Sequence, residues 1–405
     1  MAIDNKDKKV LKSSIEREQN EVACSAECEK IKGSKNLNVP PLRFPEFTEE
    51  WKAEQLDNIA TLSKGIGISK EQLSEDGEPC ILYGELYTKY KSEIIKQVES
   101  KTDINGSKLK RSKANDVIIP CSGETAVDIA TARCVPFDNI LFGGDLNVIS
   151  LHQYDGAFMS YQLNGKRKYD IARVAQGVSI VHLYGEHLKA IKTYNPTLPE
   201  QQKIAKLLSL LDDRIDTQNK IIEKLQSLIK GIAAQFTQSG TPNVRLCDCL
   251  ECHSSTLQEN CMSATGSYPV YGATGLIGYT DSYAHNGESI LIVKDGSGVG
   301  SLSYVNDHFS VIGTLNYLTP KEKYSSLYLY YALMAFNFTP YITGMAIPHI
   351  YFKDYGKAKL FCPSIEKQIR IASLLHNIEQ KLVVEQNLII SLNAQKSYLL
   401  RMLFI

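Results

Sequence analysis

The stretch Leu198–Phe236 reads LPEQQKIAKLLSLLDDRIDTQNKIIEKLQSLIKGIAAQF, and its apolar residues alternate at spacings of four and three. The stripe runs through Ile204, Leu208, Leu211, Ile215, Ile222, Leu225, Ile229, Ile232 and Phe236. Gln218 fills the one polar gap. Such a heptad stripe is typical of a long helix packed in a coiled coil. Two prolines precede the stripe, and Gly240 and Pro242 follow it, so we expect a spacer helix over residues 198–240.

The C-terminal residues repeat the same spacing. Their apolar positions are Ile371, Leu375, Ile378, Leu382, Ile389, Leu392, Leu399 and Leu403. Glu385 and Lys396 fill two polar gaps in this second stripe. The pattern predicts a second long helix over residues 365–405.

The two halves of the chain align at an offset of about 167 residues. The matched pairs include Gly177 with Gly344, Ile180 with Ile347, His182 with His349, Tyr184 with Tyr351, Pro196 with Pro363, Gln201 with Gln368, Ile204 with Ile371 and Ala205 with Ala372. The polar gap also recurs, because Gln218 aligns with Glu385. Residues 64–144 and 252–309 show little similarity. A repeat of this length indicates two whole domains rather than a solenoid, with a shared frame around two unlike middles.

Between the helices, short apolar runs are separated by Gly, Asn and Asp, as in Asp116–Pro120, Leu146–Leu151 and Ser289–Val293. These runs predict strands joined by loops. We therefore expect an α+β protein with two α/β domains, at 39–197 and 241–364. Residues 1–38 mix charges of both signs with few large apolar residues, which favours a flexible extension.

The composition is that of a soluble globular protein: 43% of residues are hydrophobic, 22% are charged, and the formal net charge is zero. No apolar run approaches the ~18–20 residues that span a bilayer, and the first residues lack the apolar region of a signal peptide. A cytoplasmic location without membrane contact is expected, with the ten cysteines mostly reduced. Zero net charge does not exclude DNA binding, because local basic patches can bind the phosphates. It also indicates that other subunits supply part of the DNA contact.

Two stretches carry a family resemblance. VPPLRFPEFTEEWKAEQLDNIATLSKG (39–65) resembles the opening of type I restriction-modification specificity subunits, and NPTLPEQQKIAKLLSLL (195–211) resembles the start of their central conserved helix. Pro363–Leu375 resembles the start of their second conserved helix, although Glu366-Lys-Gln-Ile-Arg370 departs from the first copy. The resemblance covers about residues 39–405.

The resemblance implies two target-recognition domains in pseudo-twofold tandem repeat, separated by two long helices packed antiparallel. It implies a bipartite double-stranded DNA target and a role in DNA methylation and phage defence. It also implies two modification (adenine methyltransferase) subunits, together with restriction subunits, as partners. A helix over Ile204–Phe236 would be roughly 50 Å long at 1.5 Å per residue, somewhat more than one DNA turn of about 34–36 Å. It could therefore fix the gap between half-sites. Gln218 and Glu385 either fix the register of the helix pair or lie in a frayed, exposed part of it.

The candidate DNA contacts come from basic clusters and from loops rich in small polar residues. In the first module they are Lys108, Lys110, Arg111 and Lys113, then Lys166, Arg167 and Lys168; in the second they are Lys294, Ser297, His349 and Lys353. Cationic loops bind phosphates, although a solvated surface is the alternative for any single lysine. The equivalent histidines, 182 and 349, favour a shared structural hydrogen bond. Gly296-Ser-Gly-Val-Gly300 lacks the Lys-Ser/Thr ending of a phosphate-binding loop and indicates a tight turn.

Cys247, Cys249, Cys252 and His253, with Cys261 nearby, do not have zinc-finger spacing. Cys249 aligns with Ile59, at what we expect to be an apolar strand position, so a buried thiol is the preferred interpretation. We find no methyltransferase tetrapeptide, Walker motif or nuclease constellation. The chain is expected to be non-catalytic and to hold no cofactor or metal; S-adenosylmethionine, Mg²⁺ and ATP would bind to partner subunits. The alternatives are a coiled-coil scaffold without DNA readout and, with least support, a stand-alone enzyme.

Overall fold

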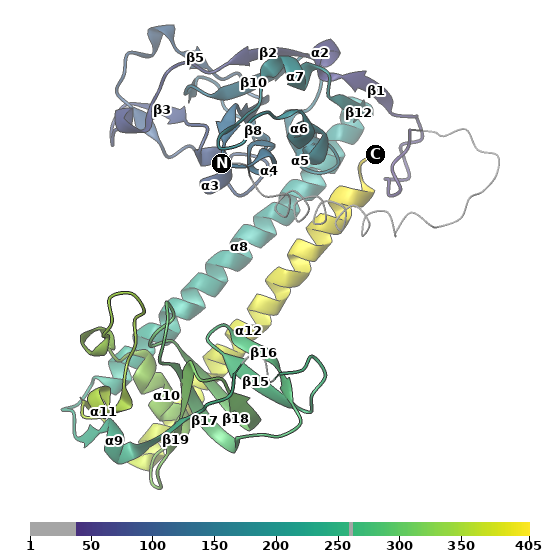
Figure 1. The fold of residues 1–405 in the computed structure, drawn as a ribbon. Coiled ribbons are helices and arrows are strands. Elements are labelled where there is room, and N and C mark those ends of the chain that lie inside the picture. The colour runs from purple at the N-terminus through teal and green to yellow at the C-terminus, as the bar shows by residue number, and fades with distance from the viewer. Residues whose placement is uncertain (1–37, 259–261) are drawn as a thin grey trace, which may run out of the picture. The chain divides into compact units, whose positions relative to one another are not determined.

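The computed structural model describes residues 38–258 and 262–405. The predictions for residues 1–37 and for Cys261 lie outside these residues. The chain divides into two compact units. Unit 1 ends at Leu210 and also holds Lys396–Ile405, and unit 2 is Leu211–Gln395. Two long helices, α8 (Leu198–Thr237) and α12 (Ile365–Met402), contribute to both units (Figure 1).

Unit 1 is built around two four-stranded sheets. The antiparallel one has the order β2 (Ala60–Lys64), β10 (Leu146–Leu151), β6 (Asp116–Pro120), β8 (Arg133–Val135). The other has the order β4 (Lys101–Thr102), β3 (Glu78–Ile81), β9 (Leu141–Phe142), β5 (Lys110–Arg111). Two short ribbons join β1 (Lys52–Gln55) to β12 (Lys192–Asn195) and β7 (Ser122–Gly123) to β11 (Val181–His182).

The helices of unit 1 are short apart from the two long ones. They are α2 (Leu56–Ile59), α3 (Glu85–Thr88), α4 (Ala126–Ile129), α5 (Gly156–Asn164), α6 (Lys168–Val174), α7 (Gly185–Lys189), and the 3₁₀ turns η1 (Lys70–Gln72) and η2 (Gly106–Lys108). Strand β6 is buried along its whole length because both faces of its sheet are covered. Val117 and Ile119 pack in one core and Ile118 packs in another, as the two-residue period of a strand requires.

Unit 2 is built on a six-stranded sheet. Its order is β14 (Leu250–Ser254), β19 (Leu315–Pro320), β17 (His285–Val293), β18 (Leu302–Val311), β15 (Tyr268–Gly272), β16 (Gly275–Thr280). Only the pairing of β15 with β18 is parallel in this sheet. The remaining elements are the β13 (Val244–Arg245) and β20 (Lys359–Leu360) ribbon, α9 (Leu246–Cys249), α10 (Ser326–Met334), η4 (Thr339–Tyr341) and α11 (Phe352–Tyr355).

The long helices pack antiparallel in each unit. In unit 2, Ile229 and Ala233 of α8 share a core with Ala372 and Leu375 of α12, whereas Gln218, earlier in α8, bonds to the later residue Glu385. In unit 1, Ile204 and Leu208 share a core with Leu403. Every heptad residue named as a packing position is buried or half-buried, so the stripe faces inward over its full length.

The polar gap in the stripe is a contact between the two helices. Gln218 Nε2 donates to Glu385 Oε2 at 2.5 Å and to the Glu385 carbonyl oxygen at 3.2 Å. The two residues are 167 positions apart and occupy equivalent places in the repeat. At this point of the helix pair, therefore, equivalent positions of α8 and α12 contact each other. Gln218 is buried, which contradicts the frayed, exposed alternative for this residue.

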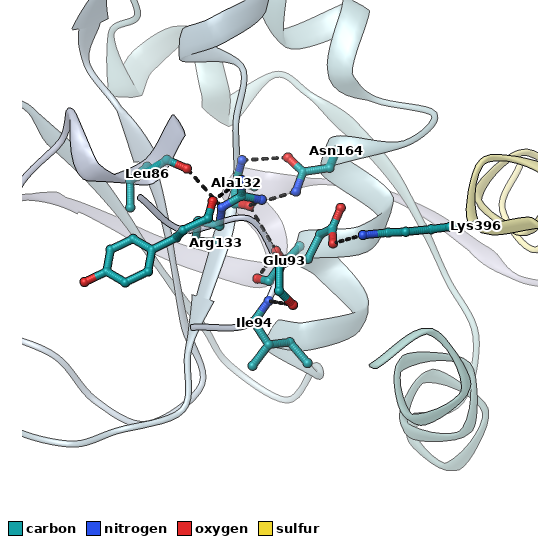
Figure 2. Close-up of polar contacts among 10 residues, drawn as sticks. Leu86, Glu93, Ile94, Ala132, Arg133, Asn164 and Lys396 are labelled. Atoms are coloured by element: carbon teal, nitrogen blue, oxygen red, sulfur yellow. Dashed lines mark hydrogen bonds and ion pairs between the residues drawn. The ribbon is translucent and has the colours of Figure 1, made fainter. Parts of the chain in front are cut away.

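The second polar gap, Lys396, fastens the end of α12 to the module of sheets and short helices in unit 1. Figure 2 shows its ammonium group against the carboxylate of Glu93, with Nζ 2.6 Å from Oε2. Glu93 is buried, and its carbonyl oxygen accepts a hydrogen bond from Ser160. Next to this pair the buried Arg133 donates to the carbonyl oxygens of Leu86 and Tyr90. This ion pair explains why a lysine interrupts the apolar stripe: the partner of Lys396 is Glu93, which lies outside the two long helices.

Gln201 and Gln368 hold the start of each long helix in the same way. The Gln201 side chain accepts from the backbone N–H of Asp155 at 2.9 Å and donates to the Pro196 carbonyl oxygen at 2.8 Å. Gln368 accepts from the N–H of Ser325 at 3.0 Å and donates to the Pro363 carbonyl oxygen at 2.8 Å. Asp155 and Ser325 cap α5 and α10. The repeated glutamine therefore joins each long helix to the capped helix of its own module.

One predicted strand position is wrong. Ile59 and Cys249 are not strand residues: they end the one-turn helices α2 and α9. In both modules this turn follows a short edge strand and precedes the first long strand of the sheet, and Cys249 Sγ lies within hydrogen-bond distance of the carbonyl oxygens of Arg245 and Leu246. Burial of the thiol is confirmed. Among the described helices, none is long and apolar enough to cross a membrane.

Candidate nucleic-acid interface

Each module carries a tight hairpin built from the repeated Gly-x-x-Ile-x-His pattern. In unit 1 it spans residues 176–182, with Gln176 and His182 exchanging two backbone hydrogen bonds of 2.8 and 2.6 Å. In unit 2 it spans residues 343–349, with Thr343 and His349 exchanging bonds of 2.9 and 2.8 Å. We call these the recurrent hairpins. Their common closure explains why the pattern appears twice.

Glycine is required at the second residue of both hairpins. Gly177 has φ 130° and Gly344 has φ 91°, a region that side chains other than glycine rarely adopt. A Cβ atom on Gly177 would lie 2.1 Å from the Ile180 carbonyl oxygen, and one on Gly344 would lie 2.3 Å from that of Ile347. The hairpin geometry therefore depends on glycine at this place.

The tips of both hairpins expose apolar side chains. Val178 is 85% exposed and Ile180 is 59% exposed in unit 1, while Met345 is fully exposed and Ile347 is 64% exposed in unit 2. Single exposed apolar residues are common, but the same exposed pair on the same hairpin in two modules is a feature of a contact surface.

In unit 2 the hairpin is fastened to the glycine-rich loop 294–300. His349 forms a strand-like bridge with Asp295, the Gly296 N–H donates to the Pro348 carbonyl oxygen at 2.9 Å, and the Ile350 N–H donates to the Lys294 carbonyl oxygen at 2.9 Å. The loop is the tight turn that the sequence predicts, with positive φ at Gly296. Thus Lys294, Ser297 and His349, distant in the sequence, lie at one edge of unit 2.

A His-x-Tyr pair with a cation beside the tyrosine occurs at both hairpins. In unit 2 the rings of His349 and Tyr351 are 5.0 Å apart, and Lys353 Nζ lies 5.0 Å from the Tyr351 ring centre. In unit 1 His182 stacks on Tyr184 at 6.2 Å, and Lys64 Nζ lies 5.9 Å from that ring. Such cation–π contacts orient a lysine at a surface.

The hydrogen bond that we expected both histidines to share is found for His349 but not for His182. His349 Nδ1 lies 3.1 Å from the Ile347 carbonyl oxygen, whereas the His182 ring stacks on Tyr184. Sequence reasoning missed Lys64, because it ends a strand whose equivalent in the second module, Ser254, carries no charge. The recurrence of the tyrosine was the available signal.

The basic run 108–113 is only partly available for contact. Lys110 and Arg111 form strand β5 rather than the expected loop, because they pair with β9. Arg111 is committed to Glu78, with nitrogen–oxygen distances of 2.6 and 3.0 Å, and this partner holds the pKa of the Glu78 carboxyl below its usual value. Lys108 and Lys113 are exposed and remain predicted phosphate contacts.

The run 166–168 also differs from the expected loop, because Lys168 begins α6. Arg167 donates to Asp170 Oδ2 at 3.0 Å and to the Ile405 carbonyl oxygen at 2.6 Å, so it anchors the end of the chain in unit 1. Lys168 is half-buried, and burial, followed by repulsion from Arg133, lowers its pKa. Lys166 is exposed and is the member of this run best placed for a phosphate.

Unit 2 also holds a stack of histidine and tyrosine rings that the sequence did not reveal. The rings of His253 and Tyr317 are 4.7 Å apart and nearly parallel, and His285 lies 5.2 Å from Tyr317. Burial and the proximity of His253 lower the pKa of His285. His253 Nε2 lies 3.0 Å from Thr319 Oγ1. These rings come from β14, β17 and β19, which only the sheet brings together.

The cysteines near His253 have other environments. Cys249 and half-buried Cys252 pack in the main core of unit 2, and burial raises the pKa of the Cys252 thiol to about 11. Over residues 38–258 and 262–405, no three His, Cys, Asp or Glu side chains are grouped so that they could hold a metal ion.

A family model, the type I restriction modification DNA specificity domain, matches residues 48–227 and 243–394. The chain belongs to this family. It is therefore a type I restriction-modification specificity subunit by family, as its motifs indicated, with the tandem α+β architecture expected for one.

Known relatives match over shorter stretches. The type I restriction enzyme EcoprrI specificity subunit of Escherichia coli is 29% identical over 112 residues, 28% of each chain. The putative type I specificity subunit S.MpnORF285P of Mycoplasma pneumoniae is 31% identical over 138 residues, 32% of this chain and 43% of that protein. The type I restriction enzyme MjaVIII specificity subunit of Methanocaldococcus jannaschii is 26% identical over 208 residues, which are 49% of this chain and 44% of that protein. Each match spans less than half of the relative's length.

Solved structures share the fold over more of the chain. The crystal structure of a type I restriction-modification system S subunit from M. genitalium has a TM-score of 0.66 at 18% identity, covering 91% of this chain and 99% of that one. A chain from a structure of type I R-M complex assembly has a TM-score of 0.52 at 16% identity, and the match covers 89% of this chain and 98% of that one. At these identities the likeness concerns the fold alone.

Proposed function

We propose that this chain is the DNA sequence-specificity subunit of a type I restriction-modification complex, in which each recognition module reads one half of a bipartite target in double-stranded DNA. The observation that carries the proposal is the recurrence of one frame around two unlike middles. The frame holds the hairpin, its glycine and the glutamine of the long helix in both modules. A repeated frame suits a repeated ligand, and unlike middles suit unlike base sequences.

The recurrent hairpins and their neighbours are the proposed DNA-contacting edges. Lysines that contact phosphate oxygens set the position of a protein on the duplex, while small polar and apolar groups read the edges of the bases. Lys353 and Lys64, oriented by their tyrosines, fit the first role. Ser297 and the exposed apolar tips fit the second, since an apolar side chain can contact a thymine methyl group.

The helix pair has a separate proposed role. Helix α8 has 40 residues, or about 60 Å at 1.5 Å per residue, and we infer that this length sets the gap between half-sites. The pair would also dock two modification subunits and, in a full nuclease, restriction subunits. The chain itself would be non-catalytic, with S-adenosylmethionine, Mg²⁺ and ATP on those partners in the cytoplasm.

Sequencing of methylated adenines in cells tests the proposal. Cells that carry the intact methyltransferase partner would express either the native chain or a chain whose residues 52–190 are replaced by another family member's module. We expect a two-part methylated motif with a fixed gap, of which the exchange changes one half only. A motif unchanged by the exchange would favour the alternative, a coiled-coil scaffold without DNA readout, and would refute the proposal.

A second measurement addresses the hairpin edge. Lys353→Ala in full-length chain assembled with its partner should weaken binding to target DNA about three- to tenfold, with a shallower salt dependence because one phosphate contact is lost. Lys381→Ala is the matched control, since Lys381 is an exposed lysine of α12 that belongs to neither the hairpin nor the loop 294–300. Equal salt slopes for both variants would remove Lys353 from the interface.

A further inference from the structure

In unit 1 the segment Val39–Trp51 is seated on the first turns of α8. Arg43 forms an ion pair with Glu200, whose side chain is 1% exposed, with a nitrogen–oxygen distance of 2.7 Å. The Trp51 indole N–H donates to the same carboxylate at 3.3 Å. Lys203 pairs with Glu46 and lies 4.6 Å from the ring centre of Phe44. The segment therefore covers this helix start with two aromatic rings and two ion pairs.

Unit 2 has an open cavity of about 440 Å³ at the start of α12. Its lining includes Phe361, Pro363, Lys367, Arg370, Ile371 and Leu374. At the repeat offset these residues are the equivalents of Tyr194, Pro196, Glu200, Lys203, Ile204 and Leu207. Glu200 and Lys203 hold the Val39–Trp51 segment, and Ile204 and Tyr194 pack in the same core as Trp51 and Phe44. The cavity thus occupies the place where unit 1 binds its own segment.

In the described part of unit 2, Phe236 at the end of α8 and Ser239 just after it complete the lining of this cavity, and it stays open. The residues before β13 are helix α8 and a six-residue link that ends at Asn243, so the module has no counterpart of Val39–Trp51. Ile204 is buried in unit 1, whereas its equivalent Ile371 is only half-buried. Lys367 and Arg370 are exposed, and neither has an ion-pair partner among residues 38–258 and 262–405.

The charges at this place differ between the units. Glu200 is replaced by Lys367, while Lys203 is replaced by Arg370. The unit 1 site offers one anion and one cation and receives Arg43 and Glu46. The unit 2 cavity offers two cations, so its complement carries carboxylates at both positions, next to an aromatic side chain for the apolar floor.

We propose that this cavity binds an extended segment of another polypeptide, which carries an aromatic side chain and two carboxylates three residues apart. Residues 1–37 do not match this description, because they contain no Phe, Tyr or Trp. The Val39–Trp51 segment of a second copy does not match either, because its Arg43 would face Lys367. The proposal goes beyond DNA reading and requires none of it.

Peptide binding to the purified full-length chain tests the proposal. The probe is a fluorescent peptide of residues 38–51, NVPPLRFPEFTEEW, in its native form and with Arg43→Glu. By fluorescence anisotropy, we expect the charge-changed peptide to bind the native chain about three- to tenfold more tightly than the native peptide, the range that exchanging attraction for repulsion at an exposed pair gives.

Reversing the charge of the cavity should reverse the preference. In the Lys367→Glu chain, which recreates the pairing of Glu200 with Arg43, the native peptide should bind more tightly than the changed one. Lys381→Glu, at an exposed position of α12 outside the cavity, should leave the preference as in the native chain. Absence of binding by both peptides, or a preference that Lys367→Glu does not alter, would overturn the proposal. Because the assay contains no DNA, its result is independent of the methylation experiment.

Discussion

Removing the repeated glutamine from one long helix should loosen its own module and leave the other unchanged. Gln201 and Gln368 are both buried, and each joins the start of its long helix to the capped helix of its module through two hydrogen bonds. We therefore expect Gln201→Ala to destabilise unit 1 and Gln368→Ala to destabilise unit 2 by similar amounts.

The magnitude follows from the groups left behind. Each alanine variant leaves one backbone N–H, of Asp155 or Ser325, and one proline carbonyl oxygen without its partner. A buried polar group that loses its partner costs about 1–3 kcal/mol. Because Asp155 is half-buried and water can reach part of the site, the expected loss is about 2–4 kcal/mol for each variant.

The chain's one tryptophan, Trp51, is buried in unit 1 and reports its unfolding by fluorescence in urea. Gln201→Ala should lower the midpoint of that transition, and Gln368→Ala should leave it in place while speeding amide exchange in α10. Gln202→Ala is the control, since Gln202 is exposed on the same helix turn. If Gln201→Ala and Gln202→Ala shift the tryptophan transition equally, the glutamine does not hold the module.

Three further perturbations have definite directions. Glu200→Ala breaks a buried ion pair and should cost unit 1 about 3–5 kcal/mol by Trp fluorescence, whereas Lys367→Ala at the equivalent position should not move its own unit's amide exchange. Gln218→Leu should lower the helix-pair melting temperature by circular dichroism, and adding Glu385→Leu should restore most of it, since no polar group is left unpaired. The lowered pKa of His285 means that the unfolded state binds more protons below about pH 6.5, so the unfolding free energy should fall from pH 7 to 5.5 and fall less in His285→Asn.

The elements that the sequence predicted are those whose cause is local. The heptad stripe predicted α8 and α12, and the apolar runs at 116–120 and 146–151 match β6 and β10 to the residue. The turn at Gly296–Gly300 followed from its glycines. In contrast, α5 and α10 are buried on nearly every side, so no polar face marks their period.

The candidate site was predicted by composition but assembled by long-range contacts. Charge density placed Arg111 and Arg167 among the DNA contacts, yet their guanidinium groups are held by Glu78 and by the Ile405 carbonyl oxygen. The last contact joins residues 238 positions apart. Whether a basic side chain faces solvent or a distant partner depends on the folded arrangement, and a single sequence does not contain that information in any local pattern.

The two copies of the frame distinguish residues that hold the backbone from residues that meet a neighbour. Gln201 and Gln368 are unchanged because both bond to a backbone N–H and a carbonyl oxygen, which are the same in any module. Glu200 and Lys367 precede these glutamines by one residue and differ in charge, because each faces side chains rather than backbone groups. Arg43 pairs with Glu200, and no described residue forms an ion pair with Lys367. If the repeat only preserved folding, an exposed position that had lost its partner would tolerate any polar residue. A cation at both Lys367 and Arg370, beside an apolar cavity, is instead the pattern of a surface matched to a new, acidic partner.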